Sequence, residues 1–194
     1  MKRSRFVSLL LCLLLVLSMA APPAFAQNAG YSDVSESDWF YEGVSYVTEN
    51  NLLEGTSSTR FSPHEVMTSG AVIDVLYRAA GEPDVTVQSA ASNAASWAIN
   101  TGIVSGVSFV PEAPVARAQM VQMLYLYTTE YLGVGAVNTG SLSGFTDASE
   151  LSLSTEYAMA WAYGNELVRG TSGTTLSPRD SVDRAQASVM IARL

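Results

Sequence analysis

A pattern of fixed landmarks occurs three times along this chain of 194 residues. In each copy an aromatic residue is followed nine positions later by a glycine, and a proline follows the glycine at a short distance. The aromatic–glycine pairs are Tyr46 and Gly55, Trp97 and Gly106, and Trp161 and Gly170, and the prolines are Pro63, Pro111 and Pro178. Self-similarity at this spacing predicts an array of similar units that share one core.

Each copy is predicted to form a helix, a loop and a second helix, because apolar residues recur at intervals of three and four. A single helix–loop–helix cannot bury its own apolar stripe, so three units are expected to close around a common core with pseudo-threefold symmetry. The fold class is therefore mainly α. In the first unit Ser37 or Asp38 is positioned to cap the first helix. The expected helices cover residues 39–51, 68–80, 91–101, 116–132, 154–165 and 183–194.

The boundaries follow from composition. Residues 1–26 have a charged start, an apolar run and a small-x-small end at Ala24–Ala26, as expected for a secretory signal. The alternative, an uncleaved membrane anchor, is disfavoured because Ser18, Pro22 and Pro23 interrupt a run that is short for spanning a bilayer. The expected divisions are unit one at 31–83, unit two at 84–132, a Gly/Ser-rich linker at 133–144 and unit three at 145–194.

Net charge excludes one class of partner. The chain has 10 Lys and Arg against 18 Asp and Glu, a net charge of −8. Three of the cations and none of the acids lie in residues 1–26, so the remainder carries 7 minus 18, or −11. Nucleic acid requires clustered cations, so it is not expected as a partner. No cysteine remains after Cys12, and no metal-binding or cofactor-binding motif is present, so we expect neither metal nor cofactor.

The spacing of further motifs resembles the S-layer homology (SLH) family. Asp33, Asp84 and Asp147 precede their aromatic landmarks by 13 or 14 residues, and each proline leads to a version of Thr-Arg-Ala-Glu. The resemblance covers residues 31–194 and implies three tandem repeats in a helical prism. It also implies a non-catalytic module on the outside of a bacterium. Its partner would be wall polysaccharide, often bearing a pyruvyl ketal, or peptidoglycan, with no membrane contact after signal removal.

The resemblance also assigns binding residues, with the two motif arginines as the leading candidates. A guanidinium suits a carboxylate, helix-start amides favour an anion, and an aromatic face packs on a sugar. Unit one has Ser69 in place of the arginine, and an aromatic at the position of Trp39 occurs in one unit only. The implied glycan-binding residues are Arg117, Arg184, Asp33, Asp84, Asp147, Trp39, Gly55, Gly106 and Gly170.

Each candidate also has a purely structural interpretation. The aromatics at 46, 97 and 161 are expected to pack in the core. The glycines favour turns, Gly55 with positive φ, and Pro63 is expected to keep the residue before it extended. The three aspartates could hydrogen-bond loop amides as readily as they could shape a pocket.

Two other functions remain open. The module could bind other surface-layer subunits and assemble. A wall-glycan hydrolase would need a carboxylate pair, such as Glu36 with Asp38 or Asp180 with Asp183, but both pairs lie at capping positions. His64, the only histidine, has no nucleophile or metal ligands beside it in the sequence. We therefore expect no enzymatic activity.

Overall fold

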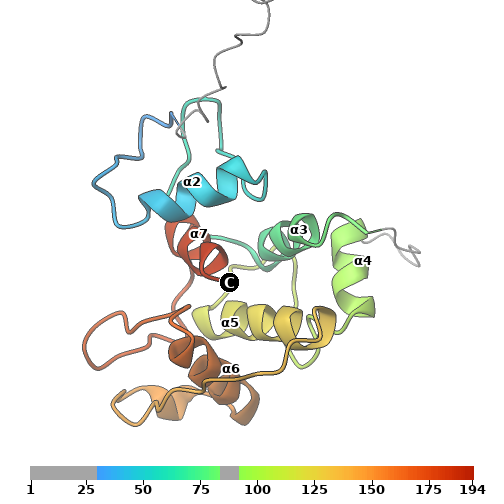
Figure 1. The fold of residues 1–194 in the computed structure, drawn as a ribbon, viewed down its shortest axis with the longest axis vertical. Coiled ribbons are helices and arrows are strands. Elements are labelled where there is room, and N and C mark those ends of the chain that lie inside the picture. The colour runs from blue at the N-terminus through green and yellow to red at the C-terminus, as the bar shows by residue number, and fades with distance from the viewer. Residues whose placement is uncertain (1–29, 84–91) are drawn as a thin grey trace, which may run out of the picture.

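The computed structural model describes residues 30–83 and 92–194, and this part of the chain is mainly helical (Figure 1). The predicted signal and Asp84 lie outside these residues. The mainly α fold class is confirmed: the described residues contain isolated β-bridges but no strand. The helices are α2 (Tyr41–Glu49), α3 (Ser69–Ala79), α4 (Asn93–Asn100), α5 (Arg117–Leu126), α6 (Leu153–Gly164) and α7 (Arg184–Ala192). A π-helical turn, Tyr127–Tyr131, continues α5, and a 3-10 turn, Ala148–Glu150, precedes α6.

Most helix starts lie where the sequence predicts them, since their caps are local. The Thr68 hydroxyl accepts the N–H of Ala71, and an Asp183 carboxylate oxygen accepts the N–H of Gln186. The start predicted for the first helix is wrong. α2 begins at Tyr41 and Phe40 precedes it without a side-chain cap, because the Asp38 carboxylate instead accepts the N–H of Ser35 in the preceding loop.

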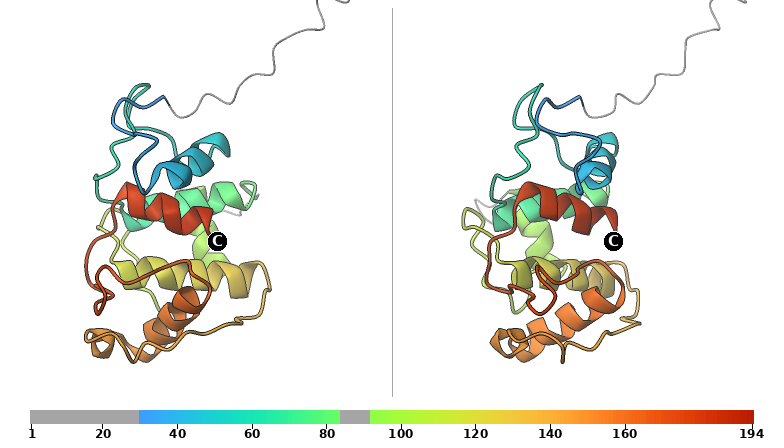
Figure 2. Two further views of the ribbon diagram at one scale, coloured as in Figure 1. Left: turned by 60° about the vertical axis from the view of Figure 1, so that its left-hand side comes forward. Right: turned by 90° about the vertical axis from the view of Figure 1, so that its left-hand side faces the viewer.

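The helices pair between units rather than within them. The principal pairs are α2 with α7, α3 with α4, and α5 with α6, and these pairs stay side by side in the views of Figures 1 and 2. The first helix of each predicted unit thus packs on the second helix of the unit before it, and the first unit packs on the third. The apolar stripe of a helix is therefore covered only when its neighbouring unit is present.

The core contains the helix stripes that periodicity predicts, among them Val72, Ile73 and Leu76 of α3. Trp97 and Trp161 are 2% and 4% exposed, so the prediction that they pack in the core is confirmed. For Tyr46 the same prediction is wrong, since its side chain is 45% exposed on the outer side of α2.

Three backbone hydrogen bonds close a ring between the units. The N–H of Met67 donates to the carbonyl of Val182 (2.9 Å), Val182 donates to Val115 (3.1 Å), and Val115 donates to Met67 (3.0 Å). All three residues are buried, and each lies one position before the cap of a second helix. We call this set the amide ring. It joins segments more than 100 residues apart in the sequence.

A second cycle of hydrogen bonds, in the opposite order, lies at the helix starts. The first amide of each second helix donates to a loop carbonyl of the next unit: Ser69 to Ala113, Arg117 to Asp180, and Arg184 to Glu65. The second amides do the same: Gly70 donates to Pro111, Ala118 to Pro178, and Ala185 to Pro63. Helix-start amides have no partner within their own helix, so a neighbouring loop satisfies these donors. These two amides of each helix are therefore already engaged, contrary to the expectation that they hold an anion.

Removing one donor from the amide ring should destabilise the whole fold. Val182→Pro loses the N–H and leaves the buried Val115 carbonyl without it, which costs about 1–3 kcal/mol. Val182→Ala keeps the N–H and is the control. We expect the proline variant to unfold at a lower urea concentration than the alanine variant, although proline fills more of the space left by valine than alanine does. Equal midpoints in circular dichroism would show that the ring contributes little.

Candidate functional site

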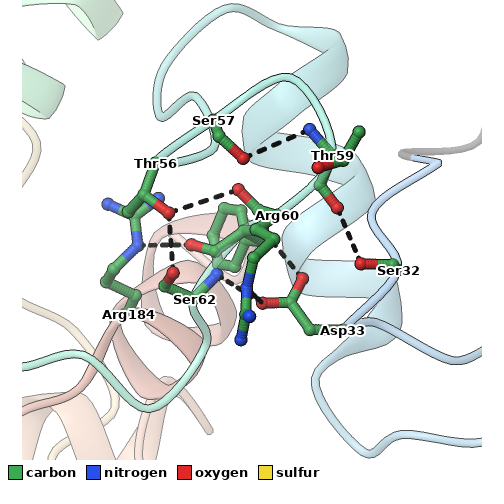
Figure 3. Close-up of polar contacts among 9 residues, drawn as sticks. Ser32, Asp33, Thr56, Ser57, Thr59, Arg60, Ser62 and Arg184 are labelled. Carbon is green, nitrogen blue, oxygen red and sulfur yellow. Dashed lines mark hydrogen bonds and ion pairs between the residues drawn. The ribbon is translucent and has the colours of Figure 1, made fainter.

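Arg184, on the first turn of α7, reaches across to the loop of unit one (Figure 3). Its Nε donates to the carbonyl of Phe61 (2.8 Å), and its Nη2 donates to the carbonyl of Glu54. The guanidinium carbon lies 4.5 Å from the centre of the Phe61 ring, a favourable cation–π distance. Burial lowers the pKa of Arg184, and the charges of Glu65, Tyr31 and Asp33 oppose this shift. Arg184 is thus half-buried and tied to the neighbouring unit.

Arg117 makes the equivalent contact at the next seam, by which we mean the boundary between two adjacent units. It lies on the first turn of α5, and its Nη2 donates to the carbonyl of Arg169 (2.8 Å) in unit three. In both seams the acceptor is the residue just before the landmark glycine. Ser69 occupies this position at the remaining seam and is 1% exposed. A guanidinium therefore bridges two of the three boundaries between units, a contact that the sequence analysis did not predict.

Arg117 is the more buried of the two arginines, with 8% of its surface exposed. Burial lowers the pKa of this guanidinium, and the charge of Asp180 opposes the shift. Its Nε is also buried and finds no hydrogen-bond partner among the described residues. A buried charge with an unsatisfied donor is costly unless something pairs with it. This is the strongest indication of a ligand in the described part of the chain.

Three of the predicted binding residues line one hollow of about 370 Å³. Trp39 comes from the loop before α2, Arg117 from α5, and Gly170 from the loop after α6. Gln186, Val189 and Arg193 complete one wall. Trp39 is 65% exposed, so its ring is free to contact a ligand. The predicted residues of three different units therefore meet at one place, which we call the Arg117 hollow.

Sequence reasoning missed Arg193, although the repeat carries a signal for it. Arg193 and Arg78 each lie ten residues after the cap of their second helix. Each donates to a carbonyl just after the first helix of its own unit: Arg193 to Glu166 and Arg78 to Leu52, both at 3.2 Å. The position is thus a repeated tie between the two helices of a unit, and in unit three it also faces the Arg117 hollow.

The two aspartates in the described residues hold loops. The Asp33 carboxylate accepts the N–H groups of Phe61 and Ser62, both at 2.9 Å. The Asp147 carboxylate accepts those of Leu176 (2.9 and 3.0 Å) and Ser177 (2.8 Å). Burial alone would raise the pKa of both carboxyl groups, but these hydrogen bonds leave each pKa below its ordinary value. The loop-supporting interpretation is therefore sufficient to explain both residues.

The landmark glycines are required mainly by close packing. A side chain at Gly55 would collide with the ring of Tyr31 and the carbonyl of Arg60, and one at Gly170 with the ring of Phe145 and two carbonyls. The prediction of positive φ for Gly55 is wrong, whereas Gly106, for which none was made, has a φ of 70°. The left-handed residue after α2 is instead Asn51 (φ 55°), four positions earlier. Ser62, expected to be extended before Pro63, also has positive φ (58°).

The groups considered for catalysis have structural partners. Asp38 and Asp183 accept backbone amides, as described above. His64 Nδ1 lies 3.6 Å from the Asp183 carboxylate, and its ring packs edge-on against Phe40. Over the described residues, no three His, Cys, Asp or Glu side chains cluster as metal ligands would, and no helix there has the length and apolar content to cross a membrane.

The model of the S-layer homology domain matches residues 30–69 and 144–188 of this chain. The two matched segments lie in units one and three. These segments hold Asp33, Asp147, Trp39 and Arg184, with the loops that carry Gly55 and Gly170. S-layer homology domains are non-catalytic binding modules of the cell wall or surface layer. The match therefore associates this chain with the cell surface.

Two relatives agree with the family match. The chain is 27% identical over 205 aligned residues to an endoglucanase of Bacillus sp. (strain KSM-635), an alignment that covers 97% of this chain and 22% of that protein. It is 26% identical over 106 residues to a surface-layer 125 kDa protein of Lysinibacillus sphaericus, covering 46% of this chain and 9% of the relative. Because the chain spans less than a quarter of either relative, these matches do not make it catalytic.

The lowered pKa of Asp147 predicts a pH-dependent contribution to stability. Its native pKa lies below the ordinary 3.8, so the carboxylate stabilises the fold above that pH, and the contribution is lost as pH falls through the native pKa. At pH 7, Asp147→Asn should cost about 1.5 kcal/mol of unfolding free energy. Urea titrations at several pH values should show the difference from the unmodified chain shrinking as pH falls below 3.8 and through the native pKa.

Glu36→Gln, which neutralises an exposed carboxylate in the loop before α2, is the control and should leave stability unchanged at every pH. A cost for Asp147→Asn that stays constant with pH would show that shape rather than charge matters at this position.

Proposed function

We propose that this chain is a non-catalytic module that attaches an exported protein to wall-linked polysaccharide of a bacterium, with the Arg117 hollow as its binding site. One observation carries the proposal. The hollow gathers Trp39, Arg117 and Gly170, three of the residues that the family resemblance implies for binding.

The chemistry of the hollow suits an acidic sugar, such as one with a pyruvyl ketal. The Arg117 guanidinium is largely buried, and a charge pair in a buried position is stronger than one at the surface. Arg117 lines the hollow, and its planar guanidinium suits a carboxylate. The indole of Trp39 offers an exposed apolar face for the C–H groups of a sugar ring. Because the chain is acidic overall, such recognition is short-range, so moderate salt should not abolish binding.

We further propose that unit two, residues 84–132, is a repeat of the same kind as the two matched segments. The chain would then have three repeats around a pseudo-threefold axis. Unit two takes part in the amide ring through Val115, and its helix start donates to unit three as the other helix starts donate to their neighbours. Arg184 with Gly55 forms a second candidate site at the seam between units three and one. Asp84, Asp33, Asp147 and Gly106 stay predicted contributors, the aspartates through the loops that they support.

An assembly function is the second candidate. The relative from Lysinibacillus sphaericus is a surface-layer protein. Several aliphatic side chains are more than half exposed, as expected of a protein-binding surface: Ile99, Val110, Leu132, Val134, Val137 and Leu153. Assembly through these residues would not involve the Arg117 hollow, so the two functions separate experimentally.

Arg117→Ala should weaken co-sedimentation of the purified chain with wall sacculi of its own bacterium at least tenfold, because it removes the buried charge. Stripping the wall polymers from the sacculi with acid should reduce binding of the unmodified chain. Arg179→Ala removes an exposed arginine paired with Glu150 and is the matched control, for which we expect full binding.

Arg117 also bridges two units, so circular dichroism must show that each variant is folded. Arg117→Lys, which keeps the charge but loses the planar fork, provides a second variant if the alanine variant unfolds. Full binding by a folded Arg117 variant would overturn the site. Ordered arrays formed without wall material, together with unchanged sedimentation after stripping, would favour assembly instead.

A further inference from the structure

The Arg117 hollow continues into two neighbouring hollows. On one side a hollow of about 380 Å³, lined by Phe145, Tyr163 and Gly173, shares Val168, Arg169 and Gly170 with it. On the other side a hollow of about 280 Å³, lined by Glu42, Tyr46 and Ala192, shares Trp39, Val189 and Arg193 with it. The three hollows are thus neighbours in a row with shared walls, and we call the row the long groove.

Aromatic side chains are spaced along the long groove. Tyr163 and Phe145 lie at one end, their rings 5.2 Å apart and edge to face. Trp39 lies between the central hollow and the other end, and Tyr46 lies at that end. Tyr46 is 45% exposed, and no hydrogen bond among the described residues uses its hydroxyl. The Trp39 ring packs edge-on against Phe40 (5.4 Å), whereas no aromatic pair among the described residues includes Tyr46.

The charge of the long groove differs from that of the whole chain. Arg117, Arg169 and Arg193 line it, against Glu42 and Glu166. Three positive and two negative groups make the groove slightly basic in a chain of net charge −8. The groove is therefore less repulsive to an acidic ligand than the chain as a whole.

We propose that the long groove binds a run of several sugar residues of an acidic polysaccharide, with Tyr46 and Arg193 as contacts beyond the Arg117 hollow. This inference rests on the proposed function and extends it. Each hollow alone is at the lower end of the range of small-molecule sites, about 300–1,000 Å³, and three in a row suit a linear chain. Aromatic faces alternating with arginines match a polymer of apolar ring faces and acidic groups. A protein partner is less suited, because the exposed aliphatic side chains lie outside the groove.

Binding should therefore depend on polymer length. The probe is wall polysaccharide released from sacculi, cut to fragments and separated by size, with affinity measured by isothermal titration calorimetry. For the unmodified chain we expect affinity to rise over the first few sugar residues and then to level off. Tyr46→Ala should weaken the longest fragment about tenfold and leave the shortest bound fragment unchanged.

Tyr157→Ala is the matched control, since Tyr157 is a 53% exposed tyrosine on α6 that does not line the groove, and both fragments should bind it normally. Affinity that is independent of length, or Tyr46→Ala equal to the unmodified chain on every fragment, would overturn the long groove while leaving the Arg117 hollow in place. If Arg117→Ala also binds every fragment normally, the proposed function fails as well.

Discussion

The amide ring is the interaction on which the rest of this structure depends. Its three bonds link residues that immediately precede the second helices, so they set the position of every helix start relative to the others. The amides at those starts then donate to loops of neighbouring units. A unit taken alone would leave these donors without partners and its apolar stripe uncovered. The fold is therefore cooperative across units, and the chain closes on itself through contacts between its first and last parts.

This closure also explains how one motif position serves both stability and binding. The arginine on the first turn of a second helix reaches the loop of the next unit, because the amide ring holds that helix start beside that loop. Arg184 is engaged there by two carbonyls and the Phe61 ring. Arg117 donates to one carbonyl, its buried Nε has no partner among the described residues, and it lines the same hollow as the exposed Trp39. Identical sequence positions thus differ in how much of the guanidinium is available to a ligand.

Sequence patterns predicted features that depend on near neighbours. The caps at Thr68 and Asp183 act over three residues, and the burial of Trp97 follows from helix periodicity. The failures involve distant partners. Gly55 is needed because the ring of Tyr31, 24 residues away, packs against it and leaves no room for a side chain. The N–H of Gly55 also donates a hydrogen bond to the Tyr31 hydroxyl. Tyr46 lies on a helix face that no other unit covers, which periodicity alone cannot reveal.

The sequence by itself determined the helical class, the repeated landmarks, most of the helix starts and the two positions that carry the motif arginines, because each is encoded within one unit. The tertiary structure alone decided which of those arginines faces a hollow and that Trp39 of unit one lies beside Arg117 of unit two and Gly170 of unit three. The physical reason is that these neighbours are set by cyclic packing between units. Spacing along the chain carries no information about which seam leaves a buried charge unpaired.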